Sequence, residues 1–151
     1  MGPANATIHA TAVLTGAKAA LIRGPSGSGK SQLAWSLIEA GRQGLLPFAR
    51  LVADDRAILE NRSGQLLVRP AQELAGAIEI RGLGIRRVEF EPVAVVGLVV
   101  DLDATDGARL PDRDATAVIV SGVRLPRLAV APGIPGLPLV LAALCIPSAG
   151  D

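Results

Sequence analysis

The sequence predicts an α/β fold, in which a single domain is built on a β-sheet of mixed direction and has few helices. A length of 151 residues suits one compact domain. Half of the residues are hydrophobic but only 2% are aromatic, so the core must consist mainly of Val, Leu, Ile and Ala. Many short apolar runs alternate with turn residues, and a helical period is clear only after residue 30. We therefore expect one domain over residues 1–151, with a core from about 8 to 146.

Short apolar runs bounded by turn residues predict the strands of this sheet. Asn61-Arg62-Ser63-Gly64 is expected to turn a hairpin between strands at 57–60 and 66–69. The other predicted strands are 8–14, 19–23, 51–53, 78–80, 93–101, 117–120 and 123–128. Helices are expected at 30–41 and, after a loop rich in Pro and Gly, at 139–144. Because strands outnumber helices, strictly alternating βαβ units are not expected.

A glycine-rich segment lies between the predicted strand at 19–23 and the predicted helix at 30–41. It matches G-x-x-x-x-G-K-[ST], the pattern of a phosphate-binding loop, with Gly24, Pro25, Ser26, Gly27, Ser28, Gly29, Lys30 and Ser31. Glycines let the backbone curl around phosphates, and the N–H groups of the following helix point at the anion. The sequence therefore predicts a P-loop nucleotide-binding domain.

The loop also indicates the ligands. Lys30 is placed to reach the β- and γ-phosphates of a nucleoside triphosphate such as ATP, and the Ser31 hydroxyl to bind Mg²⁺. The chain contains only one other lysine, Lys18. An ordinary Gly-rich turn before a helix is the alternative, and the flanking strand and helix argue against it.

Phosphoryl transfer needs a carboxylate near the metal, and two strand ends offer one. Asp54 and Asp55 follow the predicted strand at 51–53, whereas Asp101 ends the more regular run at 93–101. Spacing alone does not decide between them, and an acid at a strand end is often only a solvated turn residue. The adjacent pair, Asp54 and Asp55, is the more suggestive candidate, because one carboxylate can orient the metal while the other accepts the proton of a substrate hydroxyl.

Two further polar residues stand in apolar strands. His9 is the single histidine, and a lone histidine on a strand is more often structural than catalytic. Glu79 lies between two isoleucines before a Gly-rich turn, so it needs either a partner, a metal or the solvent face of an edge strand.

Composition argues against several other classes of protein. The net charge of +1 and the scattered arginines argue against nucleic acid as the main partner. The single Cys145 excludes an intrachain disulfide, and its apolar surroundings predict a packed structural thiol. Residues 1–6 show no signal peptide, and no apolar run is long enough for a membrane helix. We therefore expect a cytoplasmic protein.

Three segments together resemble one family. They are the phosphate-binding loop at 24–31, Leu-Val-Ala-Asp-Asp at 51–55 and Ile-Glu-Ile-Arg-Gly-Leu-Gly-Ile at 78–85. The chain resembles the C-terminal catalytic domain of HPr kinase/phosphorylase, in the short form that lacks the N-terminal domain. The first segment is common to many nucleotide-binding families, whereas the third is specific to this one. His9 also has the family's spacing before the loop, and the likeness covers most of residues 8–128.

The resemblance implies a role for each candidate residue. Asp55 would accept the proton during phosphorylation and return it in the reverse reaction, with Asp54 supporting it. Ser31 and Glu79 would bind Mg²⁺, Lys30 would bind phosphate, and His9 would orient the carboxylates. Arg109 is the looser match to a late catalytic arginine of the family. For Asp101 the resemblance implies a structural role.

The resemblance also implies a reaction. A protein-serine kinase would transfer the γ-phosphoryl group of ATP to an HPr-like phosphocarrier protein and remove it again by phosphorolysis. It would act as a homo-oligomer, which is a hexamer in this family. The family's late Pro-Gly-Arg-Asn segment is Pro132-Gly133-Ile134-Pro135 here, without the arginine tied to dephosphorylation. Two alternatives remain open at this point: a nucleotide-sensing module with little catalysis, and a small-molecule kinase.

Overall fold

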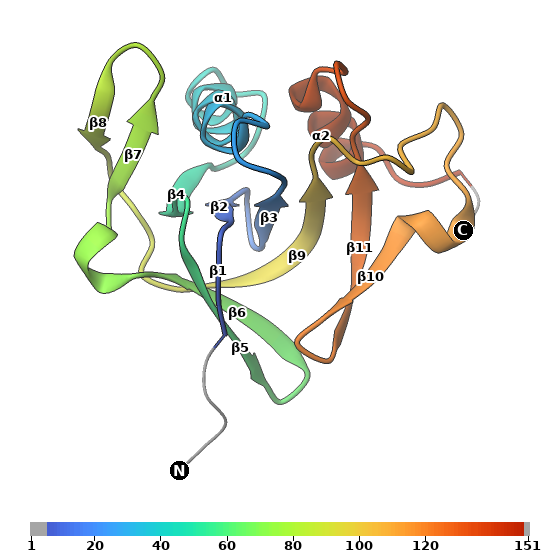
Figure 1. Ribbon diagram of the computed structural model, residues 1–151, viewed down its shortest axis with the longest axis horizontal. Coiled ribbons are helices and arrows are strands. Elements are labelled where there is room, and N and C mark those ends of the chain that lie inside the picture. Colours follow the sequence, from blue (N-terminus) through green and yellow to red (C-terminus); the bar gives the residue numbers. More distant parts are fainter. Residues whose placement is uncertain (1–5, 150–151) are drawn as a thin grey trace.

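The computed structural model describes residues 6–149 and confirms a mixed α/β fold with few helices (Figure 1). Two α-helices and eleven strands make up the described part of the chain. In chain order they are β1 (Ala6–Ile8), β2 (Thr11–Leu14), β3 (Ala19–Arg23), α1 (Lys30–Arg42), β4 (Arg50–Ala53), β5 (Ala57–Arg62), β6 (Gln65–Pro70), β7 (Ala77–Ile80), β8 (Gly84–Arg87), β9 (Ala94–Asp101), β10 (Ala117–Val120), β11 (Val123–Ala129) and α2 (Gly136–Cys145). Single turns of 3₁₀-helix cover Gln72–Leu74 and Arg113–Thr116.

Strand β9 organises the main sheet, whose order is β1-β5-β6-β9-β3-β2-β4. Its first residues pair antiparallel with β6, and its later residues pair parallel with β3 on one side and β11 on the other. The carboxyl ends of β3, β9 and β11 therefore meet at one edge of the sheet. In α/β sheets the crevice outside such strand ends is the usual place for a ligand.

The sheet has apolar side chains on both faces, as buried parallel strands require. Leu21 and Val99 lie in one core cluster, inside the curved sheet, while their neighbours Ile22 and Val100 lie in the other. That second cluster packs beneath α1 and α2, which cover the same face (Figure 1). Both helices are thereby held above the edge at which β3, β9 and β11 end.

The hairpin of β7 and β8 forms a separate two-stranded sheet beside α1 (Figure 1). Strand β8 is not among the strands that the sequence predicts. All four of its residues are exposed, so it carries no alternation of buried and exposed side chains that a sequence pattern could reveal. Its pairing with Ala77–Ile80 holds Glu79 next to the phosphate-binding loop.

Three other predictions differ in detail from the structure. The expected strand at 8–14 is two strands, because β1 pairs with β5 while β2 pairs with β3 and β4, so the chain bends between them. Helix α2 begins at Gly136 and not at residue 139, since a proline in the first helical turn costs no hydrogen bond. The predicted packing of Cys145 is wrong: its side chain is exposed at the end of α2.

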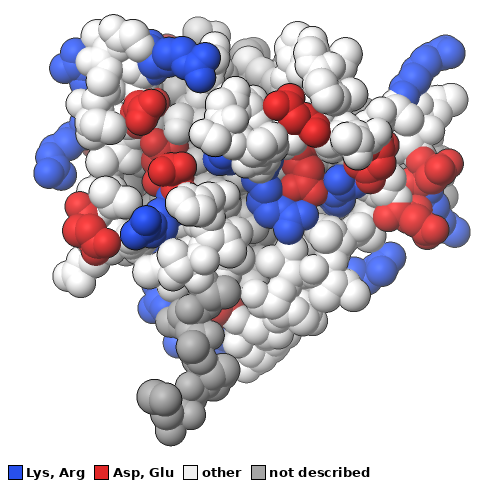
Figure 2. All heavy atoms as spheres, in the orientation of Figure 1, with Lys and Arg blue, Asp and Glu red and all other residues white. Residues whose placement is uncertain are grey.

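The surface is mixed in charge. On the face in Figure 2, Lys and Arg side chains are interspersed with Asp and Glu, and neither sign dominates. Within residues 6–149, neither helix has the length and apolarity needed to cross a membrane. The two ends at 1–5 and 150–151, which the predicted domain includes, lie outside the described residues.

Candidate active site

The phosphate-binding loop follows β3 and opens α1, as the sequence predicts. Gly27 and Gly29 have φ angles of 81° and 95°, a left-handed backbone that glycine adopts without strain. Gly24 is required for a different reason: a Cβ there would lie 2.6 Å from Ser28 Oγ and 3.1 Å from Leu102 Cβ. The loop therefore folds tightly only with glycine at these positions, and it leaves the N-terminus of α1 open to an anion.

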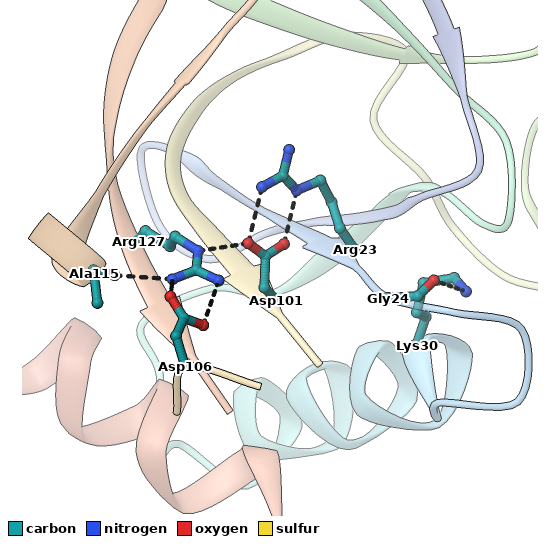
Figure 3. A network of polar contacts seen from close by, with 7 residues as sticks. All are labelled: Arg23, Gly24, Lys30, Asp101, Asp106, Ala115 and Arg127. Carbon is teal, nitrogen blue, oxygen red and sulfur yellow. Dashed lines mark hydrogen bonds and ion pairs between the residues drawn. The ribbon is translucent and has the colours of Figure 1, made fainter. Parts of the chain in front are cut away.

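Lys30 is the first residue of α1, and only 9% of its surface is exposed. Its Nζ donates hydrogen bonds to the carbonyl oxygens of Gly24, at 2.9 Å, and Pro25, at 3.2 Å. The first of these contacts is drawn in Figure 3. The ammonium group is thus held over the loop, where a bound phosphate would meet it.

Asp54 connects the loop to the rest of the site. It follows β4, is 8% exposed, and accepts three hydrogen bonds from different elements. Ser31 Oγ donates at 2.5 Å, Thr11 Oγ1 at 3.1 Å and the backbone N–H of Glu79 at 2.9 Å. A buried carboxylate that accepts three hydrogen bonds is fixed in position.

Asp55 lies beside Asp54 but has a different environment. Its φ of 66° is left-handed, which Asp tolerates better than most residues, and the side chain is exposed. Its backbone N–H donates to Thr11 Oγ1 at 3.2 Å. Thr11 is fully buried, and its hydroxyl bridges the two acids. The turn therefore holds Asp54 inward, on Ser31, and leaves the Asp55 side chain exposed.

A cavity of about 900 Å³ contains this arrangement. Its lining combines most of the loop with the acids and the hairpin: His9, Gly24, Pro25, Ser26, Gly27, Gly29, Lys30, Ser31, Gln32, Trp35, Asp54, Asp55, Glu79, Ile80 and Arg81. The structure thus brings together His9, both acids, Lys30, Ser31 and Glu79. Ser28, although it belongs to the loop, is not part of this lining. Arg109 also lies outside it, in the exposed segment after β9.

The donor set fits Mg²⁺. Ser31, Asp54, Asp55 and Glu79 offer hydroxyl and carboxylate oxygens, the ligands that this cation takes. Within the described residues no cluster of three or more His, Cys, Asp or Glu side chains is close enough to hold a metal alone. Mg²⁺ usually binds through one or two carboxylates together with substrate phosphates and water, so a site that is complete only with nucleotide suits it.

Asp101, the other acid that the sequence offered, is engaged by arginines (Figure 3). Its two carboxylate oxygens accept from Arg23 Nε at 2.7 Å and Arg23 Nη2 at 2.8 Å, and one also accepts from Arg127 Nε at 2.6 Å. Arg127 reaches on to Asp106 through two further bonds of 2.7 and 3.0 Å. Burial raises the pKa of Asp101, but the hydrogen bonds and charges of Arg23 and Arg127 outweigh it, and the pKa lies below its ordinary value. Asp101 therefore joins three chain segments and is not a free metal ligand.

Comparison with known proteins identifies the family. The family model described as the HPr serine kinase C-terminal domain matches residues 4–125. The chain belongs to this family. The chain is similar to HPr kinase/phosphorylase from Exiguobacterium sp., with 36% identity over 126 residues, which are 75% of this chain and 38% of that protein. HPr kinase/phosphorylase from Limosilactobacillus reuteri is 35% identical over 136 residues, 82% of this chain and 40% of that protein.

A solved structure of the family agrees with the fold. The Hpr(Ser) kinase/phosphatase from Coxiella burnetii matches with a TM-score of 0.73 and 25% identity, covering 92% of this chain and 88% of that one. The chain spans about two fifths of the length of the curated HPr kinase/phosphorylases above. The mixed sheet, the position of residues 24–31 between a strand and a helix, and the likeness to this family, all predicted from the sequence, are thus confirmed.

Several residues of the site were not predicted. Thr11 has the clearest structural role among them, as the bridge between Asp54 and Asp55. A buried threonine in an apolar strand two residues after His9 was the available signal, but a β-branched residue is common in any strand. Gln32, Trp35 and Arg81 line the cavity only because α1 and the β7–β8 hairpin stand side by side, which no local pattern shows.

Proposed function

We propose that this chain is the catalytic domain of an ATP- and Mg²⁺-dependent protein-serine kinase whose substrate is an HPr-type phosphocarrier of the phosphotransferase system. The observation that carries the proposal is the hydrogen-bonded path from Ser31 through Asp54 and Thr11 to Asp55, in a cavity that also holds Lys30. The names of the related proteins support the choice of acceptor. The domain would extend over residues 1–151 and act in the cytoplasm as a homo-oligomer.

The chemistry follows from where each side chain lies. Phosphoryl transfer depends on positioning and on neutralising charge. The loop N–H groups and Lys30 would hold the phosphates of ATP, and Ser31, Asp54 and Glu79 would hold Mg²⁺. When bound, Mg²⁺ would offset the negative charge of the β- and γ-phosphate oxygens.

Asp55 would be the general base. Its exposed carboxylate would accept the proton of the carrier's serine hydroxyl as that oxygen bonds to the γ-phosphorus and the bond from phosphorus to the β–γ bridging oxygen breaks. The products are phosphoserine, ADP and protonated Asp55. His9 lines the same cavity and would orient the carboxylates. Arg109 would have to approach from its exposed segment to contact a phosphate.

The reverse reaction uses the same groups. An oxygen of inorganic phosphate would bond to the phosphorus of phosphoserine as the bond from that phosphorus to the serine oxygen breaks, and protonated Asp55 would return its proton to the serine oxygen. The products would be serine and pyrophosphate. Because Ile134 stands where the family has its dephosphorylation arginine, we expect the kinase direction to dominate.

The test is multiple-turnover phosphorylation. The protein is incubated with ATP, Mg²⁺ and an excess of an HPr-type carrier, and phosphoserine on the carrier is quantified by mass spectrometry. We expect more phosphoserine than enzyme. A folded protein that binds ATP but forms no phosphoserine would support the sensing module instead, and product formed only with metabolite acceptors would support the small-molecule kinase.

A further inference from the structure

The side chain of Arg127, on β11, joins two acids that come from different segments of the chain (Figure 3). Its Nε donates to Asp101 Oδ2 at 2.6 Å, while Nη1 and Nη2 donate to the two carboxylate oxygens of Asp106 at 2.7 and 3.0 Å. The Arg127 side chain is 13% exposed. A guanidinium is planar and presents its donors in a rigid fork, so both acids are held in fixed directions.

The same guanidinium closes the base of an exposed loop. All of residues 108–114 are exposed, and this segment, the Arg109 loop, begins two residues after Asp106 and ends just before Ala115. The carbonyl oxygen of Ala115 accepts from Arg127 Nη1 at 3.1 Å, and the same nitrogen donates to Asp106. One nitrogen therefore bonds to both ends of the loop. Arg127, Asp106 and Ala115 form what we call the Arg127 clamp.

Backbone contacts hold the first end of the Arg109 loop as well. The N–H of Ala104 donates to the carbonyl oxygen of Val130 at 2.9 Å, and the N–H of Gly107 donates to the carbonyl oxygen of Ala104 at 3.1 Å. Gly107 lies directly against the chain after β11, because a Cβ on Gly107 would be 2.6 Å from Ala131 N. The loop is thus exposed along its length but fixed at its base.

Asp101 connects the Arg127 clamp to the phosphate-binding loop. It accepts from Arg23 Nε at 2.7 Å and Nη2 at 2.8 Å, and Arg23 is the residue before that loop. The N–H of Leu102 donates to the carbonyl oxygen of Arg23 at 2.8 Å, and a Cβ on Gly24 would lie 3.1 Å from Leu102 Cβ. The carbonyl oxygen of Gly24 in turn accepts from Lys30 Nζ. Short contacts therefore connect the base of the Arg109 loop to the phosphate-binding lysine.

This arrangement leaves the guanidinium of Arg109 free. Its side chain is exposed, and among the described residues it has neither an ion pair nor a hydrogen bond. An arginine directed at a transferring phosphoryl group stabilises the charge of the transition state. Its effect depends on position, since a displacement of about 1 Å can reduce a rate by about a hundredfold. An arginine on an exposed loop therefore needs a fixed base from which to reach a phosphate.

We propose that Arg127 is a positioning residue, which sets the place of Arg109 relative to the bound triphosphate by holding the base of the Arg109 loop against Asp101 and Arg23. The inference rests on the proposed function for the contact between Arg109 and a phosphate. It predicts that opening the Arg127 clamp at Asp106 slows phosphoryl transfer and leaves ATP binding unchanged, because the contacts of Asp101 with Arg23 and Arg127 remain.

Asp106→Ala opens the clamp without removing a contact of Asp101. The Asp106 side chain is 50% exposed, so its truncation is compatible with folding. Asp114→Ala is the matched control, because it removes the same charge from the far end of the Arg109 loop. Asp114 is exposed and, within residues 6–149, is not bound to Arg127. Thermal unfolding of each variant reports on the fold.

Steady-state kinetics of carrier phosphorylation compare these variants with Arg109→Ala and with the double variant Asp106→Ala/Arg109→Ala. We expect Asp106→Ala to lower kcat by about tenfold while KM for ATP stays within about twofold of the wild type. Asp114→Ala should have the wild-type constants. In the double variant kcat should be no lower than in Arg109→Ala alone, because the two residues act on the same step.

Three kinetic results would overturn the inference. They are an unchanged kcat in Asp106→Ala, an unchanged kcat in Arg109→Ala, and losses that multiply in the double variant. The wild-type protein would in each case still phosphorylate the carrier, so the proposed function would stand without the role assigned to Arg127.

Trypsin tests the clamp without a carrier, because it cleaves after arginine and the bond after Arg109 lies in an exposed loop. The rate of this cleavage, followed by mass spectrometry, reports how firmly the loop is held. We expect a non-hydrolysable ATP analogue with Mg²⁺ to slow it by about threefold or more in the wild type, and Asp106→Ala to lose most of that protection. No protection of the wild type at saturating analogue would overturn the inference. A protein that shows the protection but phosphorylates no carrier would retain the clamp and lose the proposed function.

Discussion

Ser31 Oγ donates a 2.5 Å hydrogen bond to Asp54 Oδ1, which joins the first turn of α1 to the end of β4. The same carboxylate oxygen accepts from Thr11 Oγ1, whose oxygen in turn accepts from the backbone N–H of Asp55. Four residues from three elements thus connect the predicted metal-binding hydroxyl to the predicted general base. A displacement at either end would be transmitted to the other, because each link is buried or partly buried.

Thr11 is the positioning residue in this path, and Thr11→Val tests it. Valine preserves the shape but removes the hydroxyl, so Asp54 loses one donor and the N–H of Asp55 loses its acceptor. We expect kcat for carrier phosphorylation to fall by about tenfold or more with little change in KM for ATP. Steady-state kinetics measure both constants. Thr11→Ser should recover most of kcat, and a failure of serine to do so would show that packing matters and not the hydroxyl.

Gly29 and Gly44 form a matched pair for testing the loop. Both have left-handed φ angles, 95° and 80°, and a Cβ on either would meet nothing within 4 Å. Alanine at either position should therefore cost a similar amount of stability, about 1 kcal/mol, from backbone strain alone. Only Gly29→Ala should weaken ATP binding, because only that strain distorts the loop that holds the phosphates. Chemical denaturation and calorimetry measure the two effects, and equal ATP affinities in both variants would contradict the assignment.

Asp101→Asn tests the network that joins β3, β9 and β11. Two arginines would lose their common anion, and we expect a loss of about 2 to 3 kcal/mol, less than for a fully buried pair because Arg23 is 31% exposed. The pKa of Asp101 is below its ordinary value of 3.8 in the folded protein. The stabilisation is therefore complete above about pH 4 and disappears as the pH falls through the lowered pKa.

The measurement is urea unfolding of both proteins between pH 7 and pH 2. The difference in unfolding free energy between wild type and Asp101→Asn should be constant near neutrality and shrink below about pH 4. A difference that grows on acidification, or none at pH 7, would show that the ion pairs do not stabilise the fold.

Much of the fold could be predicted because its signals are local. The hairpin of β5 and β6 follows from a Ser-Gly turn between apolar runs, and α1 follows from a glycine-rich loop and a helical period. Strand β8, by contrast, has no buried residue, and only its partner β7 keeps it extended. Local patterns describe the residues that fill a core, and β8 fills none.

Local sequence patterns also predict only part of the candidate site. The loop and the acid pair are contiguous in sequence and could be recognised there, whereas Thr11 becomes important only because β2 lies beside β4. The choice between Asp54 and Asp101 was also not local. Asp101 is not available as a metal ligand, because Arg23 and Arg127 bind its carboxylate. These arginines lie 78 residues before it and 26 residues after it in the sequence. Pairing between distant segments is information that spacing does not contain.

The most direct test of the proposed kinase compares wild type with Asp55→Asn on an HPr-type carrier, with ATP binding measured on the same preparations. Asparagine keeps the size of Asp55 but cannot accept the serine proton. The account predicts that phosphoserine formation falls by about a thousandfold or more while ATP affinity changes by less than about threefold. Undiminished phosphorylation by Asp55→Asn would contradict the role of Asp55, and with it the mechanism proposed for this site.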